Sequence, residues 1–171
     1  FYGCSKLTEL DVSGFDTSKV TTMQSMFSGC SGLTELDVSH FNTERVTTLS
    51  SMFRDCSNLE TIDVSGFRTP LVTSFCHMFD GCSSVKVLDV SNFDTSAVGT
   101  SGSTAAGHDS FSYMFAGCTE LTSLELSSFD TNGAIGMGFM FLDCINLTSL
   151  DLSHFDTSTV ATMEQMFSGC K

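Results

Sequence analysis

The spacing of the cysteines limits the folds open to this chain of 171 residues more than any other feature of its sequence. When Cys76 is left out, successive cysteines are separated by 26, 26, 26, 36, 26 and 26 positions. These cysteines are Cys4, Cys30, Cys56, Cys82, Cys118, Cys144 and Cys170. A constant period of this length is typical of chains that stack one structural unit per repeat.

The repeat divides most of the chain into six units, and the fourth contains a ten-residue insertion that fits best at 99–108. The units are 5–30, 31–56, 57–82, 83–118, 119–144 and 145–170. Both ends of the chain lie in mid-repeat register, without the atypical capping units that close such stacks. We therefore predict a single domain over 1–171, without an internal linker and as part of a longer array.

Each unit begins with a segment that has the pattern of a β-strand. In the first unit, Leu10 and Val12 lie on one face of this segment and Asp11 lies on the other, because side chains alternate along an extended chain.

The second half of each unit has the spacing of a helix. The apolar side chains of 20–30 follow one another at intervals of three, four and three positions, which predicts one buried helical stripe. Thr17, which is threonine in all six units, precedes this segment as a helix N-cap. Gly29 is expected to end the helix in a left-handed conformation.

Together these halves predict a right-handed α/β leucine-rich-repeat solenoid of six strand–turn–helix units. In this horseshoe a parallel sheet forms the concave side and short helices form the convex side. Phe15 and its equivalents replace the buried asparagine or cysteine of the common pattern. The polar groups of the turn must then be satisfied either by the backbone or by the Ser13 and Thr17 hydroxyls, and the sequence leaves both open.

The consensus L-T-x-L-D-V-S-x-F-D-T-S-x-V-T-x-M-x-x-M-F-x-G-C resembles the repeat of BspA-like leucine-rich-repeat surface proteins. The resemblance covers nearly the whole chain. It implies a secreted or surface-anchored bacterial protein linked to adhesion or host contact, and it supplies no catalytic residues.

Charge and motifs exclude several classes of function. Seven Lys and Arg against twenty Asp and Glu give a net charge of −13, which disfavours nucleic-acid binding. No segment has the apolar length of a membrane-spanning helix, so we expect no membrane insertion. No Ser-His-Asp order, G-x-S-x-G, H-E-x-x-H or phosphate-binding glycine loop is present, so we expect no enzyme activity.

The cysteine column has three interpretations: packing, disulfides or a metal site. Metal ligands usually come in close pairs, and Cys76 with Cys82 is the only close pair here. A shared place in one buried stripe favours packing of reduced thiols. Cys76, outside the column, is expected on the exposed face of its helix.

One acidic residue per unit projects from the outward face of the predicted strands, and we call this column the acidic ladder. Its members are Asp11, Asp37, Asp63, Asp89, Glu125 and Asp151. Unit charges about 5 Å apart repel by roughly 1 kcal/mol in water, so the ladder calls for counterions, partial protonation or hydrogen-bond partners. It is either a binding site for a cationic or polar ligand, or a solvated face that prevents aggregation.

We therefore expect a non-catalytic module of the bacterial cell surface, anchored or secreted. Its concave face and loops would recognise a protein or glycan of a host or neighbouring cell, without a cofactor. A structural spacer that presents another domain is the alternative, and so is Ca²⁺-dependent binding along the acidic ladder, because Ca²⁺ prefers oxygen ligands. End-to-end self-association of copies is a further expectation.

Overall fold

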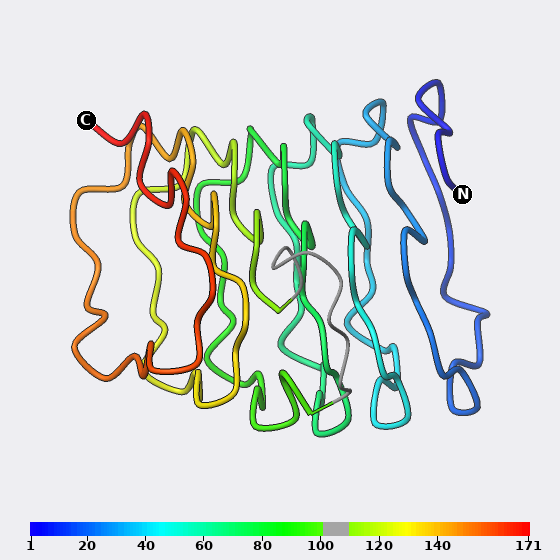
Figure 1. Cartoon of the computed structure of the whole chain (residues 1–171). Helices are drawn as coiled ribbons and strands as arrows, with labels where there is room; N and C mark the ends of the chain where they lie inside the picture. The colour runs from blue at the N-terminus through cyan, green and yellow to red at the C-terminus, as the bar shows by residue number, and fades with distance from the viewer. Residues whose placement is uncertain (101–109) are drawn as a thin grey trace.

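The chain winds into coils that stack side by side from the N-terminus to the C-terminus (Figure 1). The computed structural model describes residues 1–100 and 110–171. Backbone bonds join each coil to the next: the Phe27 N–H donates to the Met52 carbonyl at 3.0 Å, and the Phe53 N–H donates to that of Met78 at 3.0 Å. Residues about one repeat apart in the sequence are thus neighbours in space.

Within 1–100 and 110–171 the coils contain no helix and no continuous strand, so the predicted α/β leucine-rich-repeat solenoid of strand–turn–helix units is wrong. Over the described residues, regular pairing is limited to three isolated parallel bridges. These are Thr48 with Ser74, Val87 with Ser123 and Gly136 with Thr162. In the same residues, no helix is long and apolar enough to cross a membrane.

The predicted helix is a chain of β-turns, which we call the turn segment (23–30 in the first unit). The Met26 N–H donates to the Met23 carbonyl at 3.2 Å, and the Cys30 N–H donates to the Phe27 carbonyl at 3.0 Å. Both bonds span three residues, whereas an α-helix bonds over four. The N–H groups of Phe27 and Gly29 donate to the following coil instead, so the turn segments hold neighbouring coils together.

Positive φ angles explain why no helix forms. In each turn segment, a position near the middle has φ between 47° and 61°; its residues are Ser25, Ser51, His77, Tyr113, Phe139 and Gln165. The left-handed conformation costs an L-residue about 1–2 kcal/mol and interrupts a right-handed helix. The second such position was predicted correctly, because Gly29 and its equivalents also have positive φ. Apolar residues spaced by three and four positions are compatible with an α-helix and with successive β-turns. Only the positive φ at the Ser25 position distinguishes the two.

The predicted strand has the expected faces without the expected pairing. Val12 is buried and Asp11 is exposed. The backbone bonds between coils near this segment include Glu60 N–H to Thr34 and Thr122 N–H to Lys86, both 3.4 Å long. Such long bonds do not form the regular ladder of a sheet.

A ladder of buried threonines takes the place of the predicted N-caps. The Thr43 hydroxyl donates to the Arg68 carbonyl at 2.7 Å and accepts the Arg68 N–H at 2.7 Å. The same pair of bonds joins Thr17 to Asn42, Thr69 to Asp94, Thr95 to Asp130 and Thr131 to Asp156. The N-cap prediction was therefore wrong. The sequence left open whether the backbone or side-chain hydroxyls satisfy the polar groups of the turn. In the structure, the threonine hydroxyl makes the bonds to these groups.

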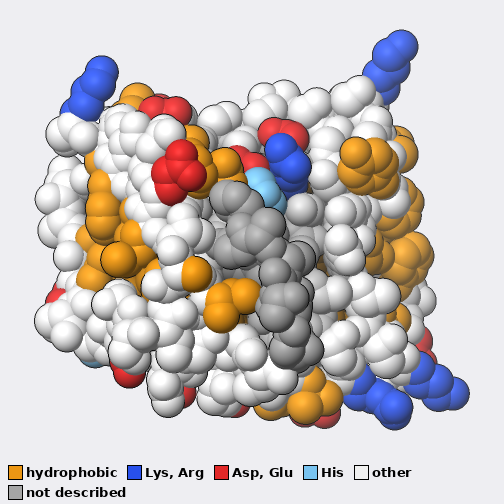
Figure 2. Space-filling view, viewed as in Figure 1, with side chains coloured by type: hydrophobic (Ala, Val, Ile, Leu, Met, Phe, Trp, Pro, Cys, Tyr) orange, Lys and Arg blue, Asp and Glu red, His pale blue; other side chains and the backbone are white. Residues whose placement is uncertain are grey.

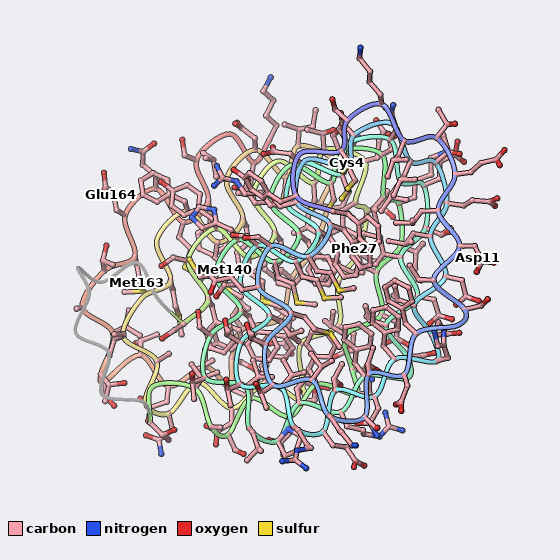
Figure 3. All side chains as sticks on the ribbon, turned by 90° about the vertical axis from the view of Figure 1, so that its right-hand side faces the viewer. Cys4, Asp11, Phe27, Met140, Met163 and Glu164 are labelled. Atoms are coloured by element: carbon pink, nitrogen blue, oxygen red, sulfur yellow. The ribbon has the colours of Figure 1, made fainter. Side chains whose placement is uncertain are left out.

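The core consists of stacked columns of identical side chains. Phe27, Phe53, Phe79, Phe115 and Phe141 are fully buried, and neighbouring rings lie 5.8 to 5.9 Å apart with nearly parallel planes. Offset stacks of this kind are a favourable arrangement for aromatic rings. Figure 3, which looks along the stack, shows Phe27 among the side chains enclosed by the coils.

The cysteine column packs as free thiols within the described residues, as predicted. The Cys56 thiol donates to the Phe27 carbonyl at 3.1 Å, and the other buried members make equivalent bonds. Burial raises the pKa of Cys56 and of Cys144 to about 12, so these thiols stay protonated near neutral pH. Cys76 is half-buried, and its predicted exposure was wrong. The predicted insertion at 99–108 lies outside the described residues, apart from Gly99 and Thr100.

Thiol counting tests this packing. Unfolded protein should react with a thiol reagent at all eight cysteines, because no disulfide is expected. Native protein should leave Cys30, Cys56, Cys82, Cys118 and Cys144 unreactive, since they are buried and protonated. Mass spectrometry of alkylated peptides identifies which residues react. Detection of a disulfide between column cysteines in the native protein would contradict this arrangement.

Candidate functional site

The structure places all six members of the acidic ladder on the exposed surface of successive coils. Asp11 projects outward from one edge of the stack in Figure 3. Asp63 lies between Asp37 and Asp89, whose negative charges both act on it, and the charge of Asp151 acts on Glu125.

Each ladder carboxylate also closes a turn in its own coil. Asp37 accepts the Ser39 N–H at 2.9 Å and the Ser39 hydroxyl at 2.7 Å. Asp89 accepts the same two groups from Ser91, at 3.0 and 2.6 Å. The other four members accept the N–H of the serine two residues later. The turn is an Asx turn at the five aspartates, and Glu125 makes the equivalent bond, so every ladder member has a local structural role.

These bonds keep the ladder ionised. The hydroxyl and N–H of Ser65 hold the pKa of Asp63 below its usual value, although the charges of Asp37 and Asp89 act in the opposite direction. The pKa of each other ladder member is lowered by its own serine in the same way. Hydrogen bonds, rather than partial protonation, therefore accommodate the column of like charges near neutral pH.

Two shallow open grooves run along the ladder. The first, of about 610 Å³, is lined by Glu9, Leu10, Asp11, Glu35, Leu36, Asp37, Ser39, Thr61 and Asp63. The second, of about 510 Å³, is lined by Ser123, Leu124, Glu125, Leu126, Ser149, Leu150 and Asp151. A surface of ionised carboxylates and hydroxyls suits basic side chains or polar groups of a partner. Within the described residues, no group of three His, Cys, Asp or Glu side chains is arranged to hold a metal ion.

A second group of functional side chains, the polar cluster, was missed by the sequence analysis. It consists of Arg54, His77, Asp80 and Tyr113. Asp80 Oδ2 lies 2.7 Å from His77 Nδ1 and 3.2 Å from Arg54 Nε, and the His77 ring stacks on Tyr113 at 4.4 Å. Figure 2 shows histidine, basic and acidic side chains gathered on one face of the coils. The signal in the sequence is that the two repeat positions that hold these residues vary from unit to unit, whereas the core columns are constant.

The polar cluster and the acidic ladder lie on different sides of the stack. The charge of Glu164 acts on Tyr113, and Figure 3 shows Glu164 at the opposite edge of the coils from Asp11. The structure therefore carries two separate polar surfaces.

Comparison with known proteins shows a family and a distant structural similarity. A family model described as "Mycoplasma protein of unknown function, DUF285" matches residues 1–112 and again 105–171. No curated protein matches the chain. One solved structure, "Functional domain of InlJ from Listeria monocytogenes includes a cysteine ladder", is similar at 20% identity with a TM-score of 0.32. The match covers 91% of this chain and 31% of that one, and it is too distant to support an argument. The resemblance to BspA-like proteins is not confirmed by these matches.

Proposed function

Since the chain belongs to the family of Mycoplasma proteins of unknown function, DUF285, we propose its function from its surface chemistry. It is a non-catalytic binding module of a bacterial cell surface, related to the BspA-like proteins and exposed outside the cell. The acidic ladder and its grooves recognise a basic protein segment or a polar glycan of a neighbouring or host cell.

The observation that carries this proposal is the column of six exposed, ionised carboxylates beside two open grooves. Such a surface attracts basic partners over a distance of about 8 Å at physiological salt. The local turn role of each carboxylate explains why an acidic residue recurs. The regular column then places all six charges on the exposed surface of the coils.

Replacing Asp37, Asp63 and Asp89 together by Asn is expected to weaken binding of a decalysine peptide about tenfold. Exposed charge pairs contribute roughly 0.2–1 kcal/mol each, so three lost pairs correspond to about one decade in the dissociation constant. Asparagine keeps an oxygen that accepts the serine N–H, so the turns stay closed. Fluorescence anisotropy at several salt concentrations measures the affinity, which should fall as salt rises.

The matched control replaces Asp16, Asp94 and Asp156 by Asn. These exposed carboxylates also close turns, each accepting the N–H of a serine two residues later, but they lie outside the ladder. Both triple variants change the net charge equally, so equal losses of affinity would contradict a site at the ladder. A spacer predicts no change in either variant. A Ca²⁺ site predicts that added Ca²⁺ raises the melting temperature of the original chain but not of the ladder variant.

A further inference from the structure

Side chains at two positions of the turn segment vary between coils although the backbone there does not. The Ser25 position has positive φ in every unit, yet it holds serine, histidine, tyrosine, phenylalanine or glutamine. The Ser28 position holds serine, arginine, aspartate, alanine or leucine. The fold therefore does not dictate these side chains, in contrast to the core columns and the threonine ladder.

These variable positions surround an open depression of about 630 Å³, which we call the pit. It is lined by Arg54, His77, Asp80, Tyr113, Ala116, Gly117, Leu142 and Asp143. Ala116 and Gly117 occupy the positions that hold Asp80 and Gly81 in the preceding coil and Leu142 and Asp143 in the following one. The pit thus lies where a small side chain stands between two larger ones.

Within the described part of the chain, the charged groups are paired on one wall of the pit and unpaired on the other. On one wall, the Arg54 guanidinium and the His77 ring both contact Asp80 Oδ2, and Arg54 also lies 3.5 Å from Asp55. On the other wall Asp143 is exposed, and none of the ion pairs among the described residues includes it. Asp143 therefore supplies an uncompensated negative charge at the rim of the pit, where its carboxylate lies against Gly169 of the following coil.

The surroundings of Tyr113 also favour a cation. The pKa of Tyr113 is raised by burial first and then by the charges of Glu164 and Asp80, with Arg54 acting weakly in the opposite direction. The Tyr113 ring also stacks on Phe139 at 4.5 Å, which holds it in place at the pit.

We propose that the pit binds the side chain of an arginine or lysine from a partner polypeptide. The aliphatic part of that side chain packs on Leu142, and its charged group pairs with Asp143. Arg54 does not repel it strongly, because Asp55 and Asp80 neutralise its charge at the other wall. This site is separate from the acidic ladder and does not depend on it.

The tyrosines allow a direct test in the full chain. The sequence has no tryptophan and two tyrosines, Tyr2 and Tyr113, and Tyr2 is 77% exposed. A Tyr2→Phe variant therefore has Tyr113 as its only tyrosine, so intrinsic fluorescence reports on the pit. Acetyl-arginine amide should change this fluorescence in a saturable way. The neutral analogue acetyl-citrulline amide should not do so at equal concentration.

Asp143→Asn in the same background should weaken arginine binding about tenfold, as expected for loss of a hydrogen bond to a charged group. Asparagine also tolerates the φ of 57° at this position, so the fold is retained. Leu142→Ala, which removes the apolar side chain that lines the pit, should weaken the response. Asp63→Asn, a change in the ladder, should leave it unchanged.

Three results would overturn the proposal: no saturable response to acetyl-arginine amide, an equal response to the citrulline analogue, or full binding by the Asp143→Asn variant. A saturable response to neutral monosaccharides in place of arginine would instead assign the pit to a glycan. Failure of decalysine binding at the ladder would affect only the proposed function, since the pit is measured through Tyr113.

Discussion

Replacing Thr69 by Asp is expected to lower the free energy of unfolding by about 3–5 kcal/mol, because it places an uncompensated charge in the buried interior. Thr69 is fully buried, donates to the Asp94 carbonyl at 2.9 Å and accepts the Asp94 N–H at 2.8 Å. A carboxylate accepts the N–H but has no hydrogen to donate to the carbonyl. Urea denaturation of the purified variant measures the loss.

Two further variants test whether Thr69 acts through bonds to the next coil or as a helix N-cap. Thr69→Ser keeps a hydroxyl and should cost only about 1 kcal/mol, mostly through the lost methyl group. Thr157→Asp changes the same repeat position where the residue is exposed, and it should be nearly neutral. Aspartate is as good an N-cap as threonine or better, so full stability of Thr69→Asp would contradict the ladder.

Truncating Phe79 to alanine is expected to cost about 3–5 kcal/mol, because the change leaves a cavity within a stack of rings. Phe79 is fully buried between Phe53 and Phe115, with ring centroids 5.8 and 5.9 Å away. Phe167→Ala is the matched control, since Phe167 has the same repeat position but is 49% exposed. Denaturation midpoints should fall much further for Phe79→Ala, and equal losses would contradict the stacked core.

Much of the burial pattern could be predicted from the sequence, whereas the backbone could not. Columns of identical residues predicted that Phe27, Cys30 and their equivalents lie inside, because repetition places like side chains next to one another. The spacing in 20–30 could not distinguish a helix from successive turns, since both bring residues three and four positions apart to one side. The residue that decides between them is Ser25, because its positive φ interrupts a helix. A serine in the sequence does not predict a positive φ.

The two polar surfaces differ in the same way. The acidic ladder was visible because one carboxylate recurs in every unit at the place where the strand pattern faces outward. The polar cluster depends on which side chains neighbouring coils bring together, and Arg54, His77 and Tyr113 lie at two different repeat positions. The sequence signal for this cluster is the variation between units at these two positions, which stands out against the constant core columns.

The bonds between turn segments give the stack an electrical polarity. The N–H groups of Ser25, Phe27 and Gly29 all donate to the following coil, and the same direction is repeated from coil to coil. Each peptide unit has a dipole of about 3.5 D, so aligned units add along the stack as they do along a helix axis. The positive pole of these units faces the C-terminal coil, the reverse of the α-helix. A chain built from nearly identical units therefore still has two electrically different ends.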